Sequence, residues 1–436
     1  GSNLAKTTLA NPVHPNILPS VTYGGGDIGF EWKTLSPRLG LTYAMGESRQ
    51  TLLRASYSRF ADQLGTGNGV AINPLYGATY AYFYYNDLNH DGNADPGEVL
   101  IGNGTPLFAS GNFDPRNGGL LISNGVDSAL DAPLTDELLF GVEHALRPEF
   151  VIGLNLTYRK VTDLLENERL VFDGNARSAA NLDNIGRLHT RNDYQSRVIT
   201  STLPNGQSVQ TTIWELKPGI TTRNGTFLEN GDREQNFTGA SFTFNKRLAN
   251  RWMLRGNVSY QDWEWETPDS ELEDPTRFIP GAHDGDPVLQ GSGTGSGSKG
   301  GVYINSNWSY SMNGLYQVAP DKPWGFNLAA NVTGREGYPV PYFRRVARNN
   351  IPGSANVQVV DSDEFRNDDI NVLDARVEKE FTFSDIGITL GVDVFNALNE
   401  NFVLQRQHRL AIGTTNNVTE IISPRIFRIG ARLSFR

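Results

Sequence analysis

The chain of 436 residues contains no cysteine, and only 38% of its residues are hydrophobic. Without cysteine there is no disulfide, no thiolate zinc site and no cysteine nucleophile. No apolar run approaches the ~18 residues that a membrane-spanning helix needs, which excludes a bundle of such helices. The net charge of −10 argues against a nucleic-acid partner, because such partners select basic surfaces.

Sequence signals for catalysis are also missing. The six histidines are scattered without an i, i+4 pair, and there is no G-x-S-x-G nucleophile motif. The segment GSGSKG at 295–300 fits G-x-G-x-x-G, but no strand and helix surround it, so we interpret it as a loop tip. We therefore expect no enzyme activity. No signal peptide opens the chain, so for an exported protein we expect it to have been removed.

What the chain does contain is a series of near-alternating apolar and polar stretches joined by turns of a few residues. A long polar loop precedes each such unit. The predicted strands are residues 37–45 and 51–61, 134–146 and 150–162, 237–248 and 252–264, 307–318 and 325–335, 370–383 and 386–398, and 425–435. These eleven strands, with short turns at one rim and long loops at the other, favour an outer-membrane antiparallel β-barrel.

The alternation suits a wall between lipid and water. In residues 237–248, Phe242 and Phe244 share one face, while Ser241 and Thr243 share the other. A half-buried sheet in a soluble sandwich has the same period. Aromatic residues near both strand ends favour the membrane, because such residues anchor at membrane interfaces. They are Phe150, Trp252, Trp324, Phe381, Phe383 and Phe435 beside the short turns, and Phe60, Tyr260, Trp263 and Trp308 near the long loops.

Eleven strands do not close a single-chain bacterial barrel, which has an even number. The first and last predicted strands both run from a long loop to a short turn, so an odd number of strands is missing before the first. We expect residues 1–36 to be the tail of an extracellular loop and 37–436 to be the C-terminal half of a barrel. The expected extracellular loops are about 62–133, 163–236, 265–306, 336–369 and 399–424.

Several of these segments resemble one family of proteins. The chain resembles TonB-dependent outer-membrane receptors, and within them the Oar-like branch. The segments that carry the resemblance are SPRLGLTY at 36–43, LRASYSRF at 53–60, LTDE at 134–137, GVE at 141–143, YRKVTD at 158–163, LDARVEK at 373–379, DVFNALN at 393–399 and SPRIFRIGARLSF at 423–435. The closing strand departs from the usual pattern because it ends at Arg436 rather than at the aromatic residue.

The resemblance implies a 22-stranded barrel in a Gram-negative outer membrane, of which these strands would be numbers 12 to 22. It implies as partners the membrane lipid, an N-terminal plug and first half-barrel of the same protein, and TonB, which couples transport to the inner-membrane proton gradient. The implied function is energised import of a bulky nutrient bound by the extracellular loops.

Two other functions remain open. The barrel could anchor a surface adhesion or assembly protein whose loops bind another surface or periplasmic protein, or it could be a passive porin. The loops are far larger than a diffusive pore requires. Polar-face arginines suit hydrogen bonding to a plug, although lumen water would serve equally. By parity these are Arg38, Arg54, Arg335, Arg428 and Arg432.

Residues 87–98 match a 12-residue calcium loop. The predicted Ca²⁺ ligands are Asp87, Asn89, Asp91, Asn93 through its carbonyl, Asp95 and Glu98. Gly92 supplies the bend that lets oxygens surround one ion, although Pro96 is unusual in such a loop and no flanking helices are predicted. The alternative is a plain external turn rich in Asn, Asp and Gly.

A dense group of aromatic residues precedes this loop. Tyr80, Tyr82, Tyr84 and Tyr85 are candidate ligand-binding residues, together with Tyr76 and Phe83 in the same group. Aromatic faces stack on sugars or pack on peptide side chains. The alternative is that these rings pack the loop on itself.

Overall fold

The computed structural model describes the chain except for residues 1, 4, 28, 66–72, 74, 76–78, 101–107, 110–111, 115–116, 122–123, 174–184, 269–282, 290–302, 384–385 and 436. The regular structure of the described residues is β-strand apart from one turn of 3-10 helix, η3 (Arg191–Asp193). Within the described ranges no helix has the length and apolar character needed to cross a membrane.

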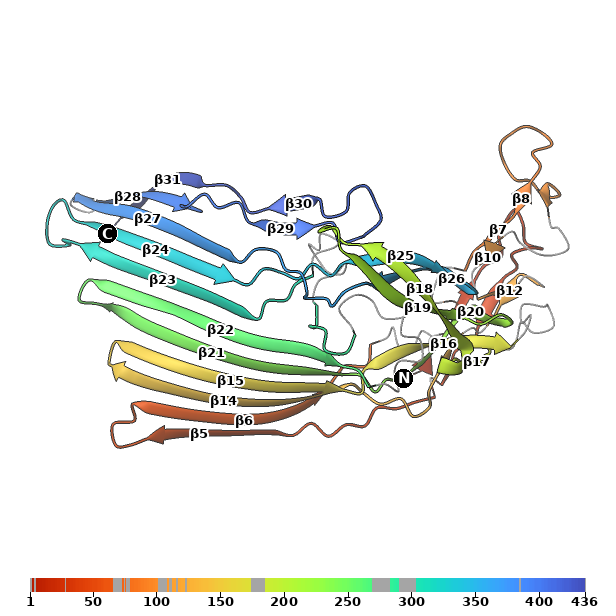
Figure 1. Ribbon diagram of the computed structural model, residues 1–436, viewed down its shortest axis with the longest axis horizontal. Helices are drawn as coiled ribbons and strands as arrows, with labels where there is room; N and C mark the ends of the chain where they lie inside the picture. Colours follow the sequence, from red (N-terminus) through yellow and green to blue (C-terminus); the bar gives the residue numbers. More distant parts are fainter. Residues whose placement is uncertain are drawn as a thin grey trace.

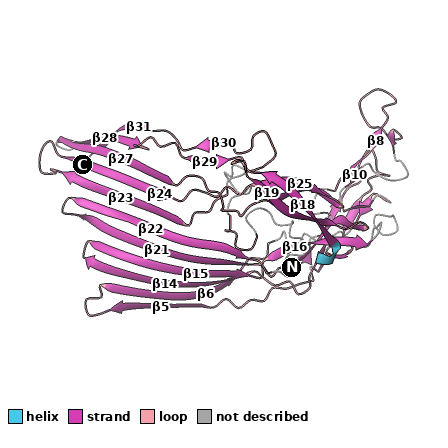
Figure 2. Ribbon diagram, in the orientation of Figure 1, coloured by secondary structure: helices cyan, strands magenta, loops and turns pink. Residues whose placement is uncertain are grey.

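All eleven predicted strands are present, and they form one antiparallel sheet (Figures 1 and 2). Each strand pairs with its neighbours in the series, from β5 at one edge to β31 at the other. The strands are β5 (Arg38–Met45), β6 (Thr51–Ala61), β14 (Leu134–Arg147), β15 (Phe150–Thr162), β21 (Glu234–Ala249), β22 (Trp252–Glu266), β23 (Trp308–Val318), β24 (Phe326–Arg335), β27 (Ile370–Phe383), β28 (Ile386–Phe395) and β31 (Ile426–Phe435).

Short turns gather at one end of this sheet and long connections at the other (Figure 1). Between β21 and β22, Asn250 and Arg251 have φ of 53° and 72°, the pair of positive values that a tight hairpin turn requires. The predicted turn at 384–385 lies outside the described residues. The C-terminus lies at the short-turn end of the sheet.

One strand ends earlier than predicted, because its last residues form a turn. β28 ends at Phe395 instead of residue 398. Asn396 has a φ of 48°, and its side-chain Nδ2 donates hydrogen bonds to the carbonyls of Glu400 at 2.8 Å and Ser423 at 3.0 Å. Its Oδ1 accepts from the backbone N–H of Glu400 at 2.9 Å. The side chain thereby joins both ends of the last long connection.

One face of the sheet is apolar across the strands. Leu328 lies opposite Tyr316 and Val377, which in turn is opposite Val392, and Val392 is opposite Ile429. These five side chains are between 43% and 83% exposed. An apolar surface of this extent is not stable against water, so it needs an apolar surrounding such as lipid.

The apolar face gives way to charged residues toward the long connections. Arg59 binds Asp136 at 2.8 Å, and Lys160 binds Glu234 at 2.5 Å. Arg59 is opposite Asp136 in the register, and Asp136 is opposite Lys160, so the charges form a row across three strands. This row marks the water-facing border of the apolar belt.

Two lysines lie at the opposite border of the belt. The Nζ of Lys246 donates to the turn carbonyls of Ala249 at 2.9 Å and Trp252 at 3.0 Å, and lies 4.0 Å from the centre of the Trp252 ring. Lys379 is 5.1 Å from the Phe381 ring and donates to carbonyls of the neighbouring turn. Each lysine thus directs its ammonium away from the belt toward the water-exposed turn.

The long connections, predicted only as polar loops, fold into small sheets. Four strands join in the order β13-β20-β16-β17, and the remaining small sheets have two strands each among the described residues. The strands are β1 (Ser2–Asn3), β2 (Lys6–Thr8), β3 (Val21–Tyr23), β4 (Gly26–Asp27), β7 (Ala81–Tyr82), β8 (Tyr84–Tyr85), β9 (Val99–Leu100), β10 (Phe108–Ala109), β11 (Phe113–Asp114), β12 (Gly119–Leu120), β13 (Gly125–Val126), β16 (Leu165–Asp173), β17 (Arg187–Leu188), β18 (Tyr194–Thr202), β19 (Ser208–Leu216), β20 (Ile220–Asn230), β25 (Phe343–Arg348), β26 (Ile351–Gln358), β29 (Val403–Arg406) and β30 (Val418–Ile421).

Three of these connections, residues 163–233, 336–369 and 399–424, pack together, and we call them the cap. Leu203, Val340, Tyr342, Val359 and Leu410 come from all three and form one buried cluster. Each of these side chains is at most 8% exposed. The cap therefore has its own hydrophobic core, whereas the eleven-stranded sheet exposes its apolar side chains.

Candidate functional site

The polar face of the sheet carries ion pairs between neighbouring strands. Arg54 of β6 binds Glu143 of β14 at 2.7 Å. Asp393 of β28 binds Arg376 at 2.8 Å on one side and Arg428 at 2.9 Å on the other. Two of the predicted polar-face arginines, Arg54 and Arg428, thus have carboxylate partners within the wall itself.

A cavity of about 310 Å³ lies on this polar face where the strands meet the long connections. Its lining comes from β15, β21, β22, β23 and β24 and from the connections beside them. The lining residues are Arg159, Phe237, Ser259, Gln261, Trp263, Val288, Ile304, Asn305, Ser306, Asn307, Ser309, Arg335 and Tyr338. Polar, aromatic and cationic side chains therefore share one enclosure.

Two arginines in the cavity differ in their partners. Arg159 donates to the Glu137 carboxylate through Nε at 3.0 Å and lies 5.7 Å from the Phe237 ring. Arg335 lies 3.5 Å from the centre of the Tyr338 ring and donates to the backbone carbonyl of Glu336 at 3.0 Å. Within the described residues Arg335 forms no ion pair with a carboxylate, so it is the site's uncompensated cation.

The sequence contains a partial signal for this cavity. Parity places Arg335 on the polar face, and the register places Trp263 opposite Phe237 on that face too. We expected Trp263 in the loop-side aromatic girdle, but it shares its side of β22 with Ser259 and Gln261 in the cavity and therefore points to the polar face. We also expected Phe60 in this girdle, but it shares its side of β6 with Arg54 and therefore points to the polar face. The residues from the connections lie too far away in sequence to be assigned by parity.

The predicted calcium loop forms the tip of a hairpin between β8 and β9 at the end of the molecule remote from the short turns (Figure 1). Asp87 accepts hydrogen bonds from the backbone N–H groups of Asp91 at 3.1 Å and Gly92 at 2.9 Å. Gly92 has a φ of 80°, as the predicted bend requires. The Asn93 N–H donates to Asp91 at 2.8 Å and holds the pKa of that carboxyl below its usual range.

The side chains of this loop only partly converge. The Nδ2 of Asn89 donates to Asp91 at 3.2 Å and to Asp95 at 2.9 Å, so an amide N–H lies between two carboxylates. Glu98 is 6% exposed and accepts from the backbone N–H groups of Leu88 and Asp95. No three His, Asp or Glu side chains in the described residues are gathered closely enough to hold a metal. Ca²⁺ coordination here requires the Asn89 amide to turn its oxygen inward.

The tyrosines before the loop are open to solvent. Tyr80, Tyr82, Tyr84 and Tyr85 are 45%, 59%, 64% and 43% exposed. The Tyr80 and Tyr82 rings pack edge to face with centres 5.7 Å apart. These side chains are therefore partly exposed, and their role in ligand binding stays a prediction. Tyr76 lies outside the described residues.

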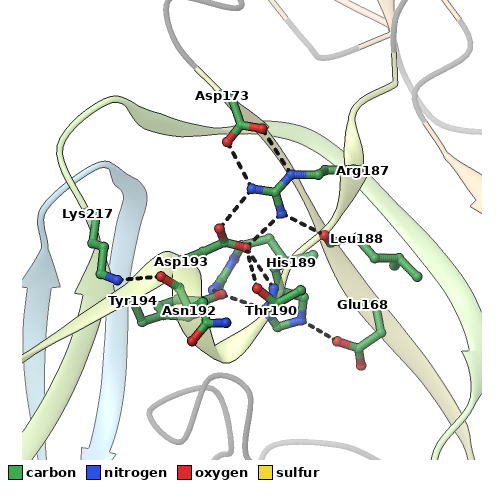
Figure 3. A network of polar contacts seen from close by, with 11 residues as sticks. Glu168, Asp173, Arg187, Leu188, His189, Thr190, Asn192, Asp193, Tyr194 and Lys217 are labelled. Carbon is green, nitrogen blue, oxygen red and sulfur yellow. Dashed lines mark hydrogen bonds and ion pairs between the residues drawn. The ribbon is translucent and has the colours of Figure 1, made fainter.

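The cap contains a partly buried polar network around η3 (Figure 3). Arg187 is held between Asp193 at 2.8 Å and Asp173 at 2.9 Å. This arginine lowers the pKa of both carboxyls. Beside it, His189 lies 2.6 Å from Glu168 through Nε2 and 2.7 Å from the Tyr194 hydroxyl through Nδ1.

The buried part of this network holds segments of the cap in place and does not present reactive groups to solvent. The His189 side chain is 1% exposed and that of Glu168 is 9% exposed. A substrate cannot reach groups enclosed in this way, whereas hydrogen bonds between buried polar side chains fix the relative positions of the segments that carry them. Sequence reasoning did not identify this network, because its members come from β16, β17, η3, β18 and the segment between β17 and η3.

A family model described as "Outer membrane beta barrel domain" matches residues 6–266 of the chain. A comparison with curated protein sequences finds no match. Among solved structures, the chain is similar to the outer membrane transporter YddB from Escherichia coli, with 12% identity, a TM-score of 0.41, and coverage of 89% of this chain and 38% of that one.

Two further structures are similar at the same level. The siderophore receptor PirA from Acinetobacter baumannii has 11% identity and a TM-score of 0.42, with coverage of 92% of this chain and 40% of that one. A point mutant of the ferric enterobactin receptor PfeA from Pseudomonas aeruginosa has 15% identity, the same TM-score and the same coverage. The chain thus spans 38% to 40% of the length of these three structures. Because the family model covers more than half of its residues, this chain belongs to the outer membrane beta barrel domain family and resides in the Gram-negative outer membrane.

Proposed function

We propose that the chain forms part of the wall of an outer-membrane receptor and transporter that binds a bulky nutrient through its long connections. The observation that supports this proposal most is the joining of a two-faced sheet to a folded cap at one end. A diffusive pore needs no such cap, whereas a receptor needs surface with which to bind its ligand.

Energy coupling is the finer part of the proposal. The motifs at 36–43, 393–399 and 423–435 resemble TonB-dependent receptors, and that resemblance implies a plug and a TonB box outside this chain. The open edges of the sheet at β5 and β31 support the idea that further strands complete the barrel, because unpaired backbone is not tolerated in lipid.

The alternative is a surface adhesion or assembly protein anchored by the barrel. The exposed tyrosines before the predicted calcium loop favour it, because such rings suit contact with another protein or with a glycan. We propose Tyr80, Tyr82, Tyr84 and Tyr85 as ligand contacts under either function.

Depletion of medium components by cells tests the transport proposal. Wild-type cells, cells that lack the gene and cells that lack TonB are grown in the same medium, and the compounds that remain are measured. Import predicts at least one compound that is depleted by wild-type cells only. Equal depletion by all three strains, together with TonB-independent loss of surface attachment in the gene-deficient cells, would support the adhesion alternative instead.

We further propose that residues 87–98 bind Ca²⁺ through Asp87, Asn89, Asp91, Asn93, Asp95 and Glu98, and that the ion rigidifies the hairpin. EDTA is then expected to increase protease cleavage around residues 76–107, because loss of the ion leaves like charges facing one another. Asp91→Ala should abolish the difference between EDTA-treated and untreated protein.

The matched control for this experiment is Asp131→Ala in the same long connection, which should retain the EDTA effect. Cleavage that is the same with and without EDTA in the unsubstituted protein would contradict a calcium site.

A further inference from the structure

We infer that the 310 Å³ cavity binds the carboxylate of a ligand whose body is a flat aromatic ring, with the Arg335 guanidinium in contact with that carboxylate. This inference rests on the proposed receptor function and names the ligand chemistry that one of its sites selects. The volume of the cavity is at the lower end of the ~300–1,000 Å³ typical of ligand pockets, so the cavity suits a small group or one end of a larger molecule.

The uncompensated charge of Arg335 is the first reason. The polar-face arginines Arg54 and Arg428 and the cavity residue Arg159 each bind a carboxylate. Arg335 has no such partner among the described residues, although it is only partly exposed. A partly buried charge without a counter-charge is costly, and an anionic ligand would remove that cost.

The nearest acidic residue in sequence is already occupied. The Glu336 carboxylate binds Arg366 at 3.0 Å and accepts the backbone N–H of Asn307 at 2.7 Å. In the described part of the chain, Glu336 accepts a hydrogen bond from Arg335 through its backbone carbonyl and not through its carboxylate. Neutralisation of Arg335 by Glu336 would require two existing contacts to break.

The orientation of the guanidinium is the second reason. Its centre lies 3.5 Å from the centre of the Tyr338 ring, which places the cation against the aromatic face. Stacking occupies the flat surface of the guanidinium and Nη1 donates to the Glu336 carbonyl, so among the described residues the edge formed by Nε and Nη2 remains to donate. A carboxylate accepts two parallel hydrogen bonds from such an edge.

The rest of the lining indicates the body of the ligand. Trp263 and Phe237 pack edge to face with ring centres 6.2 Å apart and form an aromatic wall. Val288 and Ile304 add apolar surface, while Gln261 is tied down through its donation to the Ser306 carbonyl at 3.0 Å. An aromatic ring packs favourably against such a wall, whereas a hydrated inorganic anion does not.

The test uses 4-fluorobenzoate and its neutral isostere 4-fluorobenzamide as probes. Each is titrated into the full-length protein in detergent micelles, and binding is followed by ¹⁹F NMR line broadening. We expect the carboxylate to bind about tenfold more tightly than the amide, because it gains charge-assisted hydrogen bonds. Arg335→Gln should remove this preference, and Arg335→Lys should retain part of it.

Arg255→Gln is the matched control, since Arg255 lies on the polar face of β22 outside the cavity. Retention of the preference in this variant supports a local site. An equal loss in both glutamine variants would overturn the inference in favour of general electrostatic attraction, as would equal binding of the two probes. Heat-dependent gel mobility reports whether each variant retains a folded barrel. Because binding is measured without TonB or transport, equal depletion of the medium by wild-type, gene-deficient and TonB-deficient cells would contradict the proposed function and leave this result unaffected.

Discussion

His408 is a buried histidine of the cap, with a side chain whose Nδ1 has no hydrogen-bond partner in the described part of the structure. The residue is 4% exposed, and its ring lies 4.9 Å from that of Tyr303. Burial lowers the pKa of His408 from 6.5 to about 4, because the charged imidazolium would lose its hydration. The folded cap therefore requires this histidine to be neutral.

This requirement predicts that the cap loses stability in mild acid. Between pH 6.5 and about 4 the unfolded chain binds a proton at His408 and the folded cap does not, so the free energy of unfolding falls as the pH falls. The slope is about 1.4 kcal/mol per pH unit for one group. Protease cleavage of the cap should rise from pH 7 to pH 5, and His408→Leu should flatten that rise. His90→Asn, at an exposed histidine, should leave it intact; an identical rise in the His408 variant would contradict the account.

Asn396 shows how far sequence reasoning reaches at the scale of one residue. In the sequence, the segment 393–399 is notable only because it resembles a family motif, and the sequence gives no physical reason for an asparagine at position 396. The structure supplies that reason, because Asn396 turns the chain at positive φ and its amide binds Glu400 and Ser423. Ser423 is remote in sequence, so this role follows only from the fold.

At the scale of the elements, the cap depends on two hairpins, β18–β19 and β25–β26, that are far apart in sequence and pack against each other. Ile199 and Ile213 of β18 and β19 form a buried cluster with Val357 of β26. At the edge of this cluster, Glu215 accepts hydrogen bonds from Asn349 at 3.0 Å and 3.2 Å. The two hairpins are therefore expected to open together.

Ile213→Ala tests this coupling. Ile213 is 0% exposed, so its truncation leaves a cavity that costs about 2–5 kcal/mol. Protease sensitivity should increase in both β18–β19 and β25–β26, measured by mass spectrometry of the fragments. Val198→Ala in the same hairpin, where the side chain is 58% exposed, should change little. Increased cleavage confined to β18–β19 would show that the hairpins are independent.

The elements also differ in how well the sequence predicts them. The eleven long strands were predictable because each alternates over many residues and pairs with a neighbour across a short turn or one loop. The cap strands were not, although β18, β19 and β20 are as long as several strands of the large sheet. Their packing depends on residues far apart in sequence, such as Ile213 of β19 and Val357 of β26. The cavity could not be predicted for the same reason, because Arg159, Trp263 and Arg335 come together only when the sheet has formed.

For the whole molecule, the open sheet predicts further strands. Among the described residues, β5 and β31 have one strand partner each in the eleven-stranded sheet, and Ile429 on β31 is 83% exposed. Open strand edges are not stable in hydrocarbon. We expect the protein purified from native outer membranes to have a mass of about twice the 48.1 kDa of this chain. A 48.1 kDa product without a companion fragment would contradict the half-barrel account.

The central claim is that the eleven-stranded sheet separates lipid from water, and cysteine scanning of β24 tests it most directly. Because the chain has no cysteine, single substitutions from Asn327 to Thr333 can be labelled one at a time. A water-soluble maleimide should label positions 327, 329, 331 and 333, whereas a lipid-phase quencher should affect fluorophores at 328, 330 and 332. Labelling without this period of two would contradict the account.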